Sequence, residues 1–177
     1  KSIFSDLDFK EAYSLGAINS VNWARVLAQI IYYAYASLQK ENTSVDFVVP
    51  TGNFGNIFAG FMAKKMGFPV GRLLVATNEN DILDRFFKTG EYALGDVFRT
   101  NSPAMDIQVA SNFERFLFYH FDEDTNRLCG FMEEFAQSGK ASVDGPLPSD
   151  IFLSCSTSQS DTEETVAEIN SKYGYVI

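Results

Sequence analysis

The sequence predicts an α/β domain in which helices flank a sheet of parallel strands. Short β-branched or apolar runs at 45–49, 70–76 and 150–155 are separated by longer segments with helical periodicity. Strands that alternate with helices favour parallel pairing, because each helical crossover returns the chain to the same end of the sheet. The 177 residues, 46% of them hydrophobic, are enough for one domain with its own core.

The first half of the chain opens with a charged, helix-like stretch at 5–13, followed by a long helix predicted at 20–39. Apolar residues lie on nearly every face of the long helix, so we expect it to be buried on every face. The run at 45–49 predicts a buried parallel strand. A loop at 50–55 and a second apolar helix at 56–66, closed by glycine and proline, come next.

The second half continues with a strand at 70–76, a helix at 80–88 and an irregular stretch at 91–106. The remaining predicted elements are helices at 112–119 and 126–138, a loop at 141–149, a strand at 150–155 and a helix at 160–172. Acidic residues in the first turn of the last helix suit the positive end of its dipole.

Composition excludes several classes of function. The net charge of −9 and the absence of a basic stripe argue against nucleic-acid binding. No apolar run approaches the roughly 20 residues of a membrane span, and no signal peptide is recognised. Cys129 and Cys155 form no C-x-x-C pair, so we expect no zinc site, no other metal site and no disulfide. They should be small buried hydrophobes in a protein of a reducing compartment.

The stretch from Pro50 to Asn56 predicts an anion site. A buried strand leads into a glycine-rich loop and then a helix, so backbone N–H groups and the helix N-terminus converge on one point. Glycine permits close backbone approach and positive φ, and a phosphate is the natural occupant. The loop matches neither a Walker motif nor a dinucleotide fingerprint, and an ordinary strand-to-helix turn remains the alternative.

A second anion site is predicted at the start of the long helix. Asn19 and Ser20 are good N-cap residues, and Arg25 lies about one and a half turns inside. A guanidinium on a helix that is otherwise apolar needs an anionic partner or a cavity, and its planar fork suits phosphate. The alternative is a plain capped helix whose arginine pairs with a nearby carboxylate.

The other polar candidates favour structural roles. Residues 78–81 follow the end of a strand, where α/β sites gather, but Asn80 or Asp81 is interpreted first as a helix cap. Ser102 and Asp106 are expected to shape turns. His120, the single histidine, lies in an aromatic run and is expected to be a packed or surface side chain. The acids at 122–124 should begin the next helix.

Several motifs occur in order along the first 120 residues. They are NSVN at 19–22 with Arg25, PTGNFGNIFAG at 50–60, AKKMGFP at 63–69, ATNENDIL at 76–83, SPAMDI at 102–107 and SNFER at 111–115. Together they closely resemble threonine synthases, in particular the long-chain fungal and bacterial branch. The likeness becomes looser after residue 120.

The resemblance implies the fold of the tryptophan synthase β family (fold type II), with pyridoxal phosphate (PLP) between two α/β domains. It implies the conversion of O-phosphohomoserine and water to threonine and phosphate. The positions matching the cofactor-phosphate loop are Gly52, Asn53, Phe54, Gly55 and Asn56. The positions matching the substrate-phosphate site are Asn19, Ser20 and Arg25, with Asn53 touching both phosphates.

No catalytic residue is expected in this chain. The resemblance places the Schiff-base lysine upstream in a Phe-Lys-Asp setting, and Phe9-Lys10-Glu11 is only superficially similar, so Lys10 should be a solvated surface lysine. Because the chain starts at lysine and ends in an apparent strand at 175–177, we expect residues 1–177 to be one α/β domain of a longer, cytoplasmic two-domain enzyme. The isolated chain should bind the cofactor poorly and catalyse nothing.

Two other functions stay open at this point. A threonine-synthase-like protein with similar loops would act as a phospho-lyase on a related phosphorylated substrate. A non-catalytic homologue would bind a phosphorylated ligand or a partner chain, and loss of the upstream lysine would indicate it.

Overall fold

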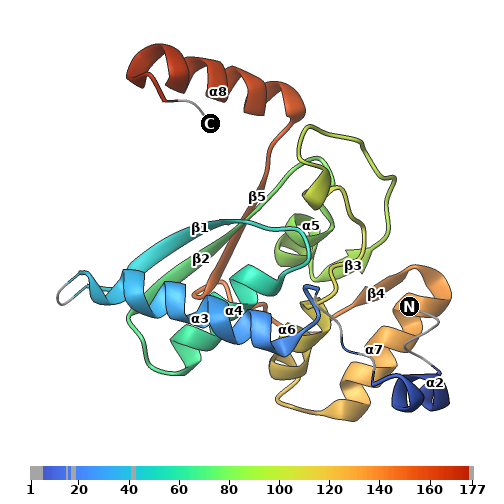
Figure 1. Cartoon of the computed structure of the whole chain (residues 1–177). Coiled ribbons are helices and arrows are strands. Elements are labelled where there is room, and N and C mark those ends of the chain that lie inside the picture. Colours follow the sequence, from blue (N-terminus) through green and yellow to red (C-terminus); the bar gives the residue numbers. More distant parts are fainter. Residues whose placement is uncertain (1–5, 15, 17–18, 41–42, 176–177) are drawn as a thin grey trace.

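The computed structural model describes residues 6–14, 16, 19–40 and 43–175. Figure 1 shows helices around a small parallel sheet, which confirms the predicted α/β class. The elements, in chain order, are α2 (Leu7–Ala12), α3 (Trp23–Leu38), β1 (Val45–Pro50), α4 (Gly55–Lys65), β2 (Val70–Thr77), α5 (Ile82–Thr89), β3 (Glu91–Ala93), η1 (Pro103–Met105), α6 (Phe113–His120), α7 (Thr125–Ser138), β4 (Lys140–Ser142), β5 (Phe152–Ser156) and α8 (Gln159–Tyr173).

The three parallel strands have the order β1-β2-β5, with β2 in the centre. The strand at 45–50 was expected to be buried, but the structure places it at an edge of this sheet. Its exposure alternates, because only one side of the strand faces the core. Asp46 is the one polar residue of β1 and lies on this open side, where the apolar Val48 is also exposed.

The two faces of the sheet have different surroundings. On one face, Leu73 lies between its register partners Phe47 and Phe152 and is fully buried by the helices. On the other face, the edge residues Val48 and Leu153, which flank the central strand, remain 70% and 38% exposed. Parallel sheets are normally covered on both faces. The described residues of this chain cover only one face of this sheet.

The long helix α3 is buried along one face only, so the prediction of burial on every face is wrong. Val26, Ile30 and Tyr33 face the core at helical spacing. The large apolar side chains that stay more than half exposed on this helix are Leu27, Ile31, Tyr32, Tyr35 and Leu38. The apolar pattern of the sequence therefore exceeds what this segment itself can cover.

Two short strands were missed. β3 and β4 pair antiparallel where an irregular stretch and a loop were predicted, and Lys140 forms an ion pair with Glu91 across them at 2.5 Å. Three residues are too few to show an alternating pattern. The other elements lie within three residues of their predicted bounds. The strand expected at 175–177 falls mostly outside the described residues.

Both cysteines are exposed, which contradicts their expected burial. Cys155 pairs with Ala76 in register, so it lies on the uncovered face of the sheet. Cys129 lies on the outer side of α7. Within the described chain, no helix is long and apolar enough to cross a lipid bilayer.

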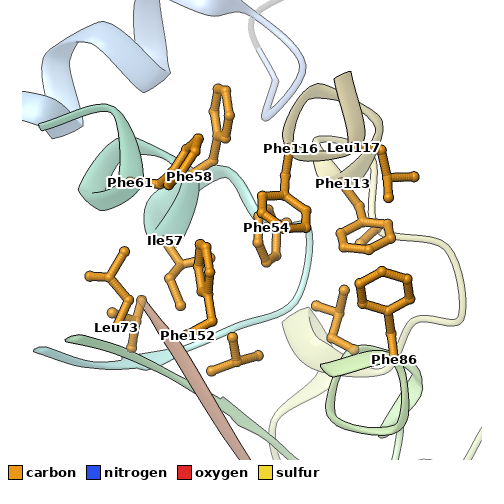
Figure 2. Packing of buried hydrophobic residues seen from close by; sticks show 14 of the residues in the cluster. Phe54, Ile57, Phe58, Phe61, Leu73, Phe86, Phe113, Phe116, Leu117 and Phe152 are labelled. Carbon is orange, nitrogen blue, oxygen red and sulfur yellow. The ribbon is translucent and has the colours of Figure 1, made fainter. Parts of the chain in front are cut away.

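The core is strongly aromatic, and Phe54 lies near its middle. Figure 2 shows its ring between the side chains of α4 and those of α6. The ring meets Phe113 edge-on at 5.4 Å between centroids, and Phe116 at 5.7 Å. Phe54 itself precedes α4 and is 1% exposed. A loop side chain is thus a central member of the core.

Gly60 marks the closest approach of α4 to its neighbours. A Cβ added there would lie 2.7 Å from the ring of Tyr33 and 2.9 Å from Leu73. We predict that Gly60→Ala destabilises the fold by about 1–3 kcal/mol, because this contact overpacks the core. A Cβ added at Gly130 of α7 would meet no atom within 4 Å. The matched change Gly130→Ala should therefore stabilise the fold by about 0.5–1 kcal/mol.

Denaturant unfolding of both variants would measure this difference. Equal effects of the two substitutions would contradict the close packing of α4 against α3 and β2.

Candidate functional site: an anion cavity at the start of α4

The turn between β1 and α4 is anchored to the sheet. Thr51, which is buried, donates its backbone N–H to Ala76 of the central strand at 2.8 Å and its hydroxyl to Val49 at 2.6 Å. Phe54, the N-cap of α4, adopts a left-handed conformation with φ 63°. The glycines were expected to supply positive φ in this loop. The structure corrects that expectation, because Phe54 takes this conformation instead.

The two glycines of the loop allow close approach. A Cβ at Gly52 would lie 2.8 Å from the carbonyl oxygen of Ala104, and one at Gly55 would lie 3.2 Å from Nδ2 of Asn112. The first neighbour is backbone and cannot move aside as a flexible side chain would. The loop therefore packs against the segments at 102–105 and 111–112.

The first turn of α4 offers backbone donors that have no partner within the helix. The first helical hydrogen bond runs from Phe58 N–H to the Phe54 carbonyl at 3.0 Å, and no side chain caps the helix. Helix geometry leaves the preceding N–H groups without intrahelical partners, and the helix dipole adds about half a positive charge there. This end of α4 therefore favours an anion.

One cavity of about 120 Å³ joins both predicted anion sites. Its described lining comprises Ser20, Arg25, Gln29, Pro50, Thr51, Gly52, Asn53, Phe54, Gly55, Asn56 and Ile57. The structure thus places the guanidinium of α3 and the loop before α4 around the same space. The alternative of an ordinary closed turn does not account for this cavity.

Arg25 has a different helical setting from the one predicted. Asn22 is the N-cap of α3, and its side chain accepts from Ala24 N–H at 2.9 Å. The helix begins at Trp23, so Arg25 lies in the first turn. Asn19 and Ser20, expected as caps, instead precede the helix.

The ion pairs found among the described residues join Arg72 to Asp46, Arg85 to Asp81, Lys88 to Asp84 and Lys140 to Glu91. None of these pairs includes Arg25. The alternative of a carboxylate partner for Arg25 therefore finds no support in the described part of the chain. A cation beside the N-terminus of α4 makes this cavity attractive to a phosphate group.

The turn at 19–22 contributes one residue to the cavity. Asn19 accepts from Val21 N–H at 3.0 Å, and the described lining of the cavity does not include it. Ser20 does line the cavity, and its hydroxyl lies 3.2 Å from that of Ser111. The Ser111 hydroxyl donates in turn to Oδ1 of Asn53 at 3.2 Å. Hydroxyls and amides therefore connect the two loops.

Sequence reasoning missed two polar residues of the site. Gln29 lines the cavity one helical turn after Arg25, and this i,i+4 spacing was the available signal. Ser111 lies in the segment that leads into α6, and only tertiary folding brings it between the loops. Tyr33 holds the cavity-lining Asn56 in place, because its hydroxyl donates to Oδ1 of Asn56 at 2.5 Å. Burial raises the pKa of that phenol, so it stays protonated.

A polar network supports the segment that faces Gly52. Asp106 accepts from the backbone N–H of Thr100 at 2.9 Å, the Thr100 hydroxyl at 2.7 Å and the Asn78 amide at 2.7 Å. These donors, the Thr100 N–H foremost, lower the pKa of the Asp106 carboxyl. The turn-forming role predicted for Asp106 is confirmed.

Asn80 is not a helix cap, contrary to the favoured prediction. It is 3% exposed. Its side chain donates to the carbonyl of Phe98 and accepts from the N–H of Phe98, both at 2.9 Å. Asp81 holds the cap position of α5 but pairs with Arg85 at 2.8 Å instead of capping. Asn80 therefore orders the loop that leads to η1.

The remaining candidates have structural roles. His120 stacks on Phe116 at 5.9 Å, and desolvation lowers the pKa of its imidazole. Asp124 caps α7 through Asn126 and Arg127 N–H groups, as expected for the start of this helix. No group of three metal-ligating side chains is found within the described residues.

The comparisons with known proteins bear on this geometry. No family model matches the chain. Threonine synthase from Saccharomyces cerevisiae is 45% identical over 96% of the chain and 36% of its own length. Threonine synthase from Pseudomonas aeruginosa is 43% identical, over 100% of the chain and 39% of its own length.

The crystal structure of PLP-bound threonine synthase from Brucella melitensis superposes with a TM-score of 0.91. It is 43% identical, and the match covers 99% of this chain and 39% of that one. This chain belongs to the threonine synthase family. It spans less than two fifths of the length of these relatives, and its fold is that of the corresponding part of a threonine synthase of fold type II.

Acid should weaken the hydrogen bonds to Asp106, which hold the segment that packs against Gly52. The folded pKa of Asp106 lies below its unfolded value, near 3.9. Its contribution to stability is therefore present above that value and is lost as the pH falls through the folded pKa. We predict that Asp106→Asn lowers the thermal midpoint at pH 7 and that the difference from wild type shrinks towards pH 3.

Thermal unfolding across this pH range measures the effect. Asp144→Asn, at an exposed loop position, is the matched control and should leave the midpoint unchanged. A constant difference between Asp106→Asn and wild type at all pH values would contradict the role given to this carboxylate.

Proposed function

We propose that this chain supplies the cofactor-phosphate and substrate-phosphate sites of a PLP-dependent threonine synthase. The whole protein would convert O-phosphohomoserine and water to threonine and phosphate. The carrying observation is the single cavity lined by Arg25 and by the loop from Gly52 to Asn56. The relatives named threonine synthase support the same conclusion.

The residues present fit the phosphate of PLP. The loop at 52–56 combines helix N–H groups that have no partner within α4 with glycines that let it pack closely against the segments near Ala104 and Asn112, and the start of α4 suits a tetrahedral anion. We assign the cofactor phosphate to Gly52, Asn53, Phe54, Gly55 and Asn56. When bound, PLP supplies the electron sink for proton transfer and loss of the substrate phosphate.

We assign the substrate phosphate to Arg25 and Ser20, with Asn19 shaping their turn. Arg25 binds the dianion through its planar fork and stabilises the charge of the leaving phosphate. We assign Asn53 to both phosphates, because its backbone belongs to the loop and its side chain accepts from Ser111, whose hydroxyl also contacts that of Ser20. These residues bind and orient, and none of them transfers a proton in this proposal.

We infer that the reactive lysine lies outside this segment. Lys64 donates to the carbonyls of Val70 and Gly71 at 2.8 and 2.9 Å, and Lys65 lies 4.5 Å from the centre of the Tyr119 ring. Lys88 and Lys140 are in ion pairs, and Lys10 is exposed in α2. The segment alone should therefore bind the cofactor weakly and have no activity.

We also propose that the rest of the enzyme covers the apolar surfaces left open here. The exposed Val48 and Leu153 of the sheet and the outer side of α3 need such a partner. The length of the relatives provides the additional chain. The two free, exposed cysteines favour a reducing compartment, and we infer a cytoplasmic location.

A second function has one observation in its favour. Proteins named threonine synthase-like 2, from Xenopus laevis and Mus musculus, are 38% and 36% identical over 81% and 95% of the chain. Such a protein would act as a phospho-lyase on a related substrate. The loops alone do not separate these two activities.

An assay of the full-length protein with PLP and O-phosphohomoserine tests the proposal. We expect equal amounts of threonine and inorganic phosphate to form. Phosphate without threonine would favour the phospho-lyase. Cofactor binding without any turnover of this substrate would overturn the assignment as threonine synthase.

Substitution of Arg25 tests whether the cavity binds the substrate phosphate and the cofactor phosphate through different residues. We predict that Arg25→Ala in the full-length protein weakens O-phosphohomoserine binding about 10- to 100-fold, the usual loss for a charge-assisted hydrogen bond, and changes PLP affinity much less. Steady-state KM and PLP titration measure the two effects.

The control for this prediction is Arg72→Ala, which removes an exposed arginine paired with Asp46 at 2.8 Å on the sheet. It should leave both affinities unchanged. Equal losses of substrate and cofactor affinity in Arg25→Ala would contradict the assignment of separate phosphate sites.

A further inference from the structure

The side-chain amide of Asn112 lies between the two loops of the anion cavity and is fully buried. Its Nδ2 donates to the carbonyl of Ser20 at 3.0 Å and to the carbonyl of Asn53 at 3.0 Å. Its backbone N–H also donates to the Asn53 carbonyl at 3.0 Å. A primary amide has two N–H hydrogens, so each loop receives one of them.

Arg115 fixes the orientation of this amide. Its Nη1 donates to Oδ1 of Asn112 at 2.6 Å, and its Nη2 donates to the carbonyl of Val21 at 2.6 Å. The guanidinium also lies 5.5 Å from the centre of the Trp23 ring, at the start of α3. The fork of the arginine therefore connects α6 to the same turn that Asn112 contacts.

The chain itself does not set the separation of the two loops. Asn112 is 92 residues from Ser20 and 59 from Asn53 in sequence. No short connection holds the loops together, so their spacing depends on tertiary contacts. Gly55 leaves room for this arrangement, because a Cβ there would press on Nδ2 of Asn112 at 3.2 Å.

We propose that Asn112, oriented by Arg115, is a positioning residue that sets the distance between the two phosphate-binding loops. The inference rests on the proposed function, because it takes the Ser20 and Asn53 loops to hold two different phosphates. Asn112 contacts both loops through their carbonyl groups, so one side chain links the backbone of the Ser20 turn to that of the Asn53 loop. It therefore selects ligand pairs whose phosphates lie at one separation.

The test uses the full-length protein and two probes, PLP and inorganic phosphate. Asn112→Ala removes the donor of the Ser20 carbonyl and one of the two donors of the Asn53 carbonyl, and so frees the loops to move apart. We expect PLP affinity of the apoprotein and inhibition by inorganic phosphate each to weaken about tenfold or more. Arg25→Ala, in contrast, should affect inorganic phosphate mainly.

A core variant distinguishes positioning from general stability. Phe135→Leu truncates a buried side chain of α7, and it should lower the thermal midpoint without changing either affinity. If Asn112→Ala lowers the midpoint but leaves both affinities at wild-type values, the residue is structural only and the proposal is overturned.

A double-substitution cycle tests whether Arg115 acts through Asn112. The Arg115→Ala variant should weaken both affinities, and adding Arg115→Ala to Asn112→Ala should cause no further loss. Additive losses would overturn the orienting role of Arg115. If Asn112→Ala does not fold, Arg115→Ala and Arg115→Lys provide the same readouts, with the lysine variant expected to recover only part of the affinity because it lacks the fork.

The wild-type protein separates this proposal from the proposed function. Wild type that binds neither PLP nor phosphate would refute the function itself. Wild type that binds both, together with an Asn112→Ala variant of equal affinities, would refute only the positioning role.

Discussion

The burial of the Phe54 ring determines the shape of the anion cavity. Phe54 adopts φ 63°, a conformation that costs an ordinary side chain about 1–2 kcal/mol. Full burial of a phenylalanine ring contributes about 1.5–3 kcal/mol, which offsets that cost. The turn therefore keeps its left-handed form while the ring remains among Phe113 and Phe116. This conformation leads directly into α4, whose first residues line the cavity.

The other walls of the cavity are held by tertiary contacts of the same kind. The Asp106 network orders the segment whose Ala104 carbonyl faces Gly52, and Asn112 connects the Ser20 and Asn53 carbonyls. The donors of the cavity come from the first turn of α4 and from the guanidinium of Arg25. Such donors suit a dianion, which accepts hydrogen bonds and donates few.

Local sequence was enough to predict the strand, loop and helix around residues 50–56, and the structure brings Arg25 to the cavity beside that loop. Local sequence did not predict which residue takes positive φ, because packing of the Phe54 ring, and not glycine, decides it. It misplaced the cap of α3, since several of the residues at 19–22 are good caps and tertiary contacts choose among them. The open sides of α3 and of the sheet were predicted as buried because an apolar pattern does not say which partner covers it. Asn112 has no local signal of its position, since both of its carbonyl partners are distant in the chain.

The long sequence separations within the cavity have a consequence for the life of the protein in the cell. Segments near residues 20, 53 and 112 meet only once the domain has folded, so an unfolded chain offers a phosphorylated ligand no comparable site. A ligand that binds only the folded state stabilises it by about 2.7 kcal/mol at a concentration of 100 times its Kd. A phosphorylated ligand bound in this cavity would thus slow proteolytic turnover of the protein.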